Sequence, residues 1–435
     1  MTTWWMDKIA VCAVVAGVLL PAVGQSQERS DVGADLTLEQ ALERTRDQNE
    51  EWEITQERIT QSRAARREAL AGLLPRLVAN GSVTAYGREI EFNGNTVQPR
   101  FDWGVSGTAS IVVFDGTQYP LVSRAGELLD ATKAQAKWQR RTIEFETTTS
   151  YYVLAAAQEQ VAIAEKTVEL RERELERAEA LLDAGIAVKL DVTRARTNML
   201  SARQSLVDAR AQLGNARDSL AVVLGEEPGT VYRAELGADT VRTPPEVTEI
   251  SLEGRADFEA TQRQIEATRL EEQSIWWSLF PTIGLSANGV VGPPTTFGRP
   301  DGYRLSLTLN ATWVLYDGGA RYARLDQAES RVREQQLEYE RSLREANAGV
   351  SRARRDWDSA VSAVEVAREQ VDAAQETYVN ARARFENGLA NSLEVNDASQ
   401  QLFQAKVLLN QRILDARTAA AEFDYLRTLT GQDDP

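Results

Sequence analysis

Residues 385–400 read FENGLANSLEVNDASQ, and residues 182–197, which lie 203 positions earlier, read LLDAGIAVKLDVTRAR. Each stretch has a glycine, an apolar residue three positions before it, and an acid followed by valine six and seven positions after it. In both, helix-forming sequence rich in Ala, Leu and Val stops at the glycine and then resumes. Because glycine commonly ends helices, we predict that Gly185 and Gly388 are the tips of two antiparallel helical hairpins.

The two tips belong to a unit that occurs twice in the chain. The stretches LLPRLVANGSVTAYG (73–87) and SGTASIVVFDG (106–116) correspond to LFPTIGLSANGVVG (279–292) and LTLNATWVLYDGG (307–319). Such self-similarity in constant order indicates an internal duplication. We predict a signal peptide at 1–24; a first repeat at 25–230 with a strand pair at 77–114 and a hairpin at 117–224; a second repeat at 231–431 with a strand pair at 282–316 and a hairpin at 318–430; and a tail at 432–435.

The hairpin helices carry apolar residues at the alternating three- and four-residue spacing of a coiled coil. The first helix has this spacing at Val161, Ala164, Val168, Arg171, Leu175, Ala178 and Leu182. Arg171 alone among these is polar, and every equivalent position of the second repeat is apolar. Helices over 117–183 and 318–386 would each be roughly 100 Å long at 1.5 Å per residue.

Each repeat also holds a strand pair with an apolar and a polar face. Over 304–316 one face has Leu305, Leu307, Leu309, Ala311, Trp313 and Leu315. The other face has Arg304, Ser306, Thr308, Asn310 and Thr312. This period of two is typical of strands that separate an apolar from a polar environment. An Asp-Gly step follows each pair, so we expect Asp115 and Asp317 to cap the helices that come next.

Composition excludes several classes of function. The net charge is −16, from 49 basic and 65 acidic residues, which disfavours nucleic acid as a partner. Histidine is absent, and the single cysteine, Cys12, lies within the apolar part of the expected signal peptide. We therefore expect no metal site, no cofactor and no catalytic residue, and predict that the chain is not an enzyme. No later segment is apolar enough for a membrane-spanning helix, so we expect a secreted, periplasmic or outer-membrane protein.

The strands favour a pore shared between several copies. Four strands cannot close a barrel, and an open sheet edge is not stable in hydrocarbon. The chain must therefore oligomerise if its strands cross the outer membrane. The alternative is a non-pore periplasmic coiled-coil scaffold, in which the strands form a small soluble cap on a rod.

The whole mature chain, over residues 36–431, resembles the TolC-like outer-membrane factors. The resemblance is carried by LTLEQALERTRDQN (36–49) followed by LLPRL, by FDG (114–116) and YDGG (316–319), and by the two Gly-x5-[Asp/Glu]-Val tips. It implies a homotrimer whose twelve-stranded β-barrel crosses the outer membrane and continues as a helical tunnel into the periplasm. It also implies a periplasmic adaptor and an inner-membrane pump as partners, with drugs, ions or proteins as the exported substrates. A collar would come from 225–252 and from helices near 37–72 and 252–278.

The resemblance assigns functional residues to the tips. The acidic ring of the tunnel aperture corresponds to Glu394 and Asp397, and the acid of the first tip to Asp191. Adaptor docking is expected around Gly185 and Gly388, with Lys189 and Leu389 beside them.

One part of the family pattern is absent from the second tip. The arginine and tyrosine that help to latch the closed aperture are replaced by Ala390 and Phe385. Contacts through Lys189 or Arg194 are then expected to take over closure.

Overall fold

The structure is a computed structural model that describes residues 34–92, 95–234, 241–245, 252, 254–292 and 303–427. The expected signal peptide and C-terminal tail lie outside these residues. In chain order the elements are β1 (Ala34–Leu36), α1 (Leu38–Gln48), α2 (Glu50–Ala71), β2 (Arg76–Ala85), β3 (Ile90–Phe92), β4 (Asn95–Gln98), β5 (Phe101–Phe114), α3 (Gln118–Asp183), α4 (Lys189–Val223), β6 (Tyr232–Ala234), α5 (Ala256–Trp277), β7 (Thr282–Val291), β8 (Tyr303–Thr312), α6 (Ala320–Glu386) and α7 (Ser392–Leu426).

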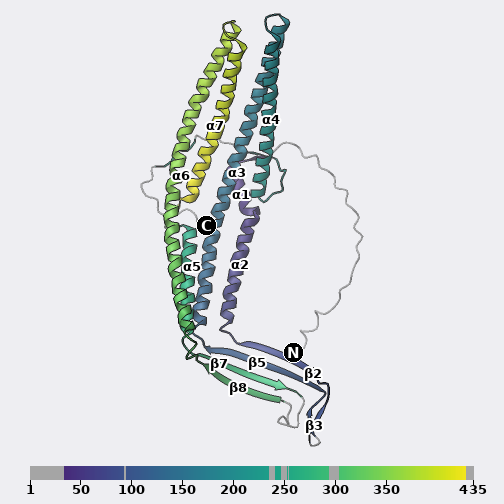
Figure 1. The fold of residues 1–435 in the computed structure, drawn as a ribbon, viewed down its shortest axis with the longest axis vertical. Helices are drawn as coiled ribbons and strands as arrows, with labels where there is room; N and C mark the ends of the chain where they lie inside the picture. Colours follow the sequence, from purple (N-terminus) through teal and green to yellow (C-terminus); the bar gives the residue numbers. More distant parts are fainter. Residues whose placement is uncertain are drawn as a thin grey trace.

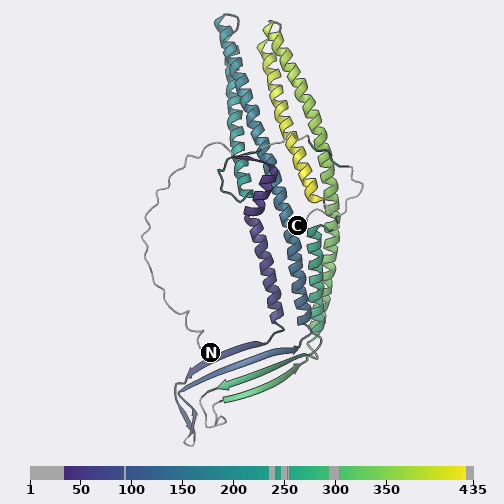
Figure 2. The same ribbon diagram turned by 180° about the vertical axis from the view of Figure 1, so that it is seen from behind.

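Two long helical hairpins determine the shape of the molecule. Helix α3 pairs with α4 and α6 pairs with α7, and the two hairpins lie side by side with their tips at the same end (Figure 1). The shorter helices α2 and α5 pack along the other halves of α3 and α6, and the sheet lies at the end opposite the tips (Figure 2). The predicted fold class is thus confirmed: the chain is mainly helical, has a small β part, and repeats one helix–strand pattern twice.

The first hairpin is aligned by ion pairs with a seven-residue period. Three arginines of α4 contact three glutamates of α3 at 2.6–3.2 Å, namely Arg196 with Glu179, Arg203 with Glu172, and Arg210 with Glu165. The numbers rise along α4 as they fall along α3, as expected for antiparallel coiled-coil helices. Because the side chains are exposed, each pair contributes at most about 1 kcal/mol, and the pairs chiefly favour one register.

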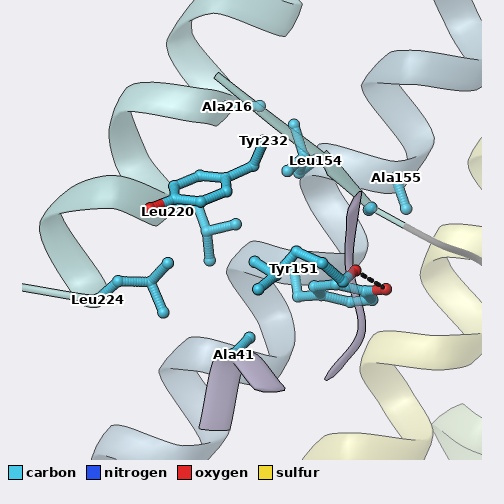
Figure 3. Packing of buried hydrophobic residues seen from close by; sticks show 10 residues of the cluster. Ala41, Tyr151, Leu154, Ala155, Ala216, Leu220, Leu224 and Tyr232 are labelled. Carbon is cyan, nitrogen blue, oxygen red and sulfur yellow. Dashed lines mark hydrogen bonds between the residues drawn. The ribbon is translucent and has the colours of Figure 1, made fainter. Parts of the chain in front are cut away.

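A compact core lies where the first hairpin meets α1, β1 and β6. Tyr151 of α3 and Leu220 of α4 are fully buried and pack with Tyr232 of β6 (Figure 3). The Tyr151 hydroxyl donates a 2.9 Å hydrogen bond to the carbonyl of Leu36 in β1, and β1 pairs in parallel with β6. The start of the described chain is therefore held against β6, at the beginning of the predicted second repeat.

The helix expected over 37–72 is two helices that meet at Asn49. The Asn49 side chain accepts hydrogen bonds from the backbone N–H groups of Glu51 and Trp52, which caps α2. Its amide group donates a 2.7 Å bond to the carbonyl of Val223, at the end of α4. The break was not predicted, because the hydrogen bond that the Asn49 amide group donates joins it to Val223, a residue distant in sequence.

Gly225 packs against this junction, and its replacement is expected to destabilise the junction between α1 and α2. Its φ is +74°, and a Cβ atom added there would lie 2.2 Å from the carbonyl oxygen of Gln48. Gly225→Ala should lower the free energy of unfolding by at least about 1 kcal/mol, since it combines left-handed strain with a backbone clash. Thermal denaturation followed by circular dichroism measures the change. Gly214→Ala, inside α4 with open space around the new Cβ, is the control and should be neutral or stabilising.

The four-stranded sheet is antiparallel throughout, in the order β2-β5-β7-β8. Its register places one row of paired residues on a wholly apolar face; for example, Ala109 pairs with Ala287, which pairs with Leu307. The adjacent row, which contains Thr108, Asn288 and Ser306, lies on the polar face. The predicted alternation is thus observed across all four strands, and it separates two chemically different surfaces.

Asp115 and Asp317 are not the N-cap residues of the helices that follow them. Helix α3 has Thr117 as its N-cap, and the Asp115 carboxylate instead accepts bonds from the Thr117 backbone N–H and hydroxyl, at 3.0 and 2.7 Å. Helix α6 has Gly319 as its N-cap, and Asp317 pairs with Arg321 at 3.0 Å. Each acid lies two residues too early because the turn after it is longer than an Asp-Gly step suggests.

The last strand is also shorter than expected. Strand β8 ends at Thr312, whereas the prediction extended to residue 316. The indole N–H of Trp313 donates a 3.0 Å hydrogen bond to the carbonyl of Leu279, close to the end of α5. This bond ties the chain after the strand to the neighbouring helix.

Candidate functional site at the hairpin tips

The two hairpin tips have the same backbone structure. Gly185 and Gly388 have φ values of +73° and +72°, which L side chains rarely adopt. In each tip the glycine N–H bonds to the carbonyl three residues before it, and the next N–H, that of Ile186 or Leu389, bonds to the carbonyl five residues before its own position. These are the two hydrogen bonds of the Schellman motif, so the glycines end their helices as predicted.

The acids of the second tip lie at the start of α7. The backbone N–H of Glu394 is capped by the side chain of Asn391 at 3.0 Å, and the Glu394 carboxylate lies 3.5 Å from Arg384 on α6. Asp397 follows one helical turn later on the same face. Both carboxylates are exposed. The structure therefore places two neighbouring negative charges close to the tip, one of them beside an arginine.

The acid of the first tip links the two hairpins. The Asp191 carboxylate accepts a 2.9 Å hydrogen bond from the hydroxyl of Ser392 on α7. Its second oxygen accepts from the backbone N–H of Val188 at 3.4 Å, which stabilises the start of α4. Asp191 thus lies in the contact between tips rather than on a free surface.

A second link runs from α3 to the end of α6. Glu386 accepts hydrogen bonds from Arg177 at 2.9 Å and from Arg382 at 3.0 Å. These two bonds lower the pKa of the Glu386 carboxyl group, that of Arg177 being the larger cause. The guanidinium group of Arg177 also lies over the ring of Phe385, 5.6 Å from its centroid. Because the pKa of Glu386 is lowered, the link is present at pH values above the ordinary pKa of a carboxyl group. It is lost as the pH falls through the lowered pKa.

A third link is buried. Arg171 is 3% exposed, and its guanidinium group contacts Glu174 at 2.9 Å and the side-chain oxygen of Asn396 on α7 at 3.2 Å. Beside it, a cavity of about 360 Å³ lies between the hairpins and is lined by Glu174, Arg177, Tyr378 and Phe385 among others. Burial raises the pKa of the Tyr378 hydroxyl, so it remains protonated at neutral pH. The buried arginine is therefore a fixed polar contact between two mainly apolar surfaces.

Closure through Lys189 or Arg194 stays a prediction, because the structure contains a single chain. Neither side chain forms an ion pair with any residue that the structure describes. No local pattern in the sequence marks Arg177, Glu386 and Ser392, because their contacts between hairpins join residues some 200 positions apart. Arg171 did carry a signal, since it is the one polar residue in an apolar heptad row.

Two kinds of feature are absent from the described residues. No cluster of three or more His, Cys, Asp or Glu side chains in those ranges is arranged to hold a metal ion. Within the same ranges, no helix combines the length and the hydropathy of a membrane-spanning segment.

Comparison with solved structures reveals the same fold in outer-membrane channels. The chain is similar to CusC, known from crystal structures concerned with transmembrane channel formation, with a TM-score of 0.80, 20% identity, and coverage of 91% of this chain and 93% of that one. It is similar to the CmeC outer membrane channel of Campylobacter jejuni, with a TM-score of 0.79, 14% identity and coverage of 97% and 96%. It is also similar to the open state of the MtrE outer membrane channel of Neisseria gonorrhoeae, with a TM-score of 0.71, 19% identity and 93% coverage of both chains.

Sequence comparison assigns the family. No curated protein matches the chain. The sequence model described as "Outer membrane efflux protein" matches residues 39–226 and 248–432, that is, most of both repeats. The match therefore shows that this chain belongs to the outer membrane efflux protein family.

Proposed function

We propose that three copies of the chain form a channel that exports substrates across the outer membrane, in an assembly with a periplasmic adaptor and an inner-membrane pump. The observation that carries the proposal is the exposed apolar face of the sheet. Leu305, Leu307 and Leu309 of β8 are 78%, 73% and 67% exposed, and their face has no charged residue among the described strand positions. A surface of this kind suits the hydrocarbon of a membrane and argues against a soluble cap on a rod.

The edges of the sheet support an assembly of several copies. Among the described strands, β2 and β8 pair on one side only, and each leaves a row of backbone N–H and carbonyl groups without a partner strand. Hydrocarbon does not tolerate such edges, whereas pairing β8 of one copy with β2 of the next removes them. Two copies would give about eight strands, whose interior side chains fill, so three is the smallest number that leaves a passage.

The exposed acids of the second tip are proposed to line the periplasmic aperture. Three copies would bring six carboxylates, from Glu394 and Asp397, to one opening, where crowded negative charge favours cations. Replacing both residues by Ala should lower the preference for potassium over chloride in planar bilayers. Glu365→Ala with Asp372→Ala, two exposed acids further along α6, is the matched control. Equal selectivity in the two double variants would remove Glu394 and Asp397 from the aperture.

The tips are also the proposed docking surface for the adaptor. Ile186 and Leu389 follow the two tip glycines and are 76% and 71% exposed, although the Schellman motif usually tucks this residue against its helix. Ile186→Glu with Leu389→Glu should abolish cross-linking of the channel to its adaptor in cells without changing the amount of channel. Val207→Glu, an exposed apolar residue far from the tip on α4, should leave cross-linking unchanged. Retention of the cross-link in the tip variant would place docking elsewhere.

A further inference from the structure

The polar face of the four-stranded sheet is lined mainly by hydroxyl and amide groups. In the channel proposed above, the sheets of three copies close into a barrel. The polar face then lines the lumen, because the apolar face contacts lipid. Its uncharged polar members are Asn80, Ser82, Thr84, Ser106, Thr108, Ser110, Thr282, Ser286, Asn288, Ser306, Thr308, Asn310 and Thr312. Of the described strand positions on this face, Arg76, Asp102 and Arg304 carry a charge.

The two arginines lie on the edge strands, away from the acid. Arg76 begins β2, at the end of the sheet next to the helices, and pairs with Ser110. Arg304 pairs with Val290, which pairs with Ser106, so it lies four residues further out along the sheet. Asp102 pairs with Thr84, another four residues further out. Sealing β2 against β8 of the next copy would bring Arg76 and Arg304 onto neighbouring strands.

The arginine side chains are not neutralised by their surroundings. Both are exposed, and neither forms an ion pair with any described residue. Each copy therefore contributes two positive charges and one negative charge to a lumen that is otherwise uncharged at the described positions of the four-stranded sheet. This sign is opposite to the net charge of the whole chain, −16.

We propose that Arg76 and Arg304 form two cationic rings inside the β part of the channel and make this part selective for anions. The inference rests on the proposed function, since the rings are complete only when three copies close the barrel. A pore surrounded by lipid focuses the field of its lining charges, so the rings attract carboxylate, phosphate or sulfonate groups of a passing molecule. The channel then has two charged regions in series, an acidic aperture at the tips and a basic lumen within the membrane.

The test measures reversal potentials of the full-length channel in planar bilayers under a potassium chloride gradient. Arg76→Ser with Arg304→Ser should lower the ratio of chloride to potassium permeability several-fold, because only charge leaves an otherwise hydroxyl-lined surface. Arg76→Lys with Arg304→Lys retains both charges and should give the wild-type ratio. The single serine variants should give intermediate ratios, which keeps the test decisive if the double variant fails to assemble.

The outcomes separate this inference from the proposed function. A wild-type protein that conducts no current would contradict the channel itself. A conducting channel whose permeability ratio is the same in the wild-type, lysine and serine variants would overturn the cationic rings and leave the channel intact. A ratio that changes equally in the lysine and serine variants would also overturn the rings, because charge would not be its cause.

Discussion

Arginine in place of Leu307 is expected to abolish assembly of the channel, whereas arginine in place of Thr308, the next residue, should leave assembly intact. Leu307 lies on the apolar face of β8 and is 73% exposed in the single chain, while Thr308 lies on the polar face. A charged side chain on the lipid face of a membrane strand costs about 2–4 kcal/mol near the bilayer centre. The cost recurs in every copy of a trimer, whereas an arginine toward the lumen remains in water.

The measurement is the amount of trimer recovered from outer membranes, separated without heating on a denaturing gel. Leu307→Arg should leave little or no trimer, and Thr308→Arg should give the wild-type amount. Both variants introduce arginine into the same strand at adjacent positions, so the face of the sheet on which the new charge lies is the main difference between them. Equal recovery of the two variants would mean that the apolar face of the sheet does not contact lipid.

Replacing Arg171 by Ala is expected to loosen the contact between the hairpins near their tips. The substitution removes a buried guanidinium group and leaves Glu174 without its cation and Asn396 without its donor. Breaking a buried ion pair by removing one partner costs about 3–5 kcal/mol. Because the Glu174 side chain is 20% exposed, we expect a loss of stability at the lower end of this range, about 3 kcal/mol.

The consequence is expected in both stability and conductance. The Arg171→Ala channel should denature at a lower temperature and conduct more current than the wild type, since separated hairpins widen the aperture. Arg173→Ala is the matched control, because Arg173 lies two residues away on α3 with a side chain that is 64% exposed, and its contact with Glu169 is 3.9 Å long. If both variants behaved alike, the buried contact would have no part in holding the tips together.

The repeated architecture could be predicted because it rests on local patterns. Glycine readily adopts the left-handed backbone conformation found at Gly185 and Gly388. The heptad spacing likewise indicates which side of each helix packs against its partner helix. Alternation likewise predicted both faces of the sheet. These signals are short-range and occur twice, so each copy supports the interpretation of the other.

The details that failed depend on residues distant in sequence. The break at Asn49 needs the carbonyl of Val223, and the link between hairpins needs Arg177 and Glu386, which are 209 positions apart. The N-cap residues lie two positions after Asp115 and Asp317 because the turns are longer than expected. In the second copy Gly318 and Gly319 both have positive φ, and Arg321 donates a hydrogen bond to the carbonyl of Ser278 at the end of α5. Local sequence specifies such turns poorly.

Cysteine cross-linking between the two edge strands tests most directly whether sister chains close the sheet. Within one chain β2 and β8 are three strand spacings apart, about 14 Å, whereas a disulfide needs Cα atoms within about 7 Å. Any disulfide between them must therefore join two chains. Val78→Cys on β2 is combined in turn with Ser306→Cys, Thr308→Cys or Asn310→Cys on β8, which scans the unknown register. Cys12, the single natural cysteine, lies in the expected signal peptide.

The control pair is Thr108→Cys with Asn288→Cys, which are direct partners on β5 and β7 and should form a disulfide inside one chain. For at least one of the edge pairs, the channel should migrate after oxidation as a ladder of one, two and three chains that ends at three. If every edge pair gave only single chains after oxidation while the control disulfide formed, the result would contradict the closed trimeric channel.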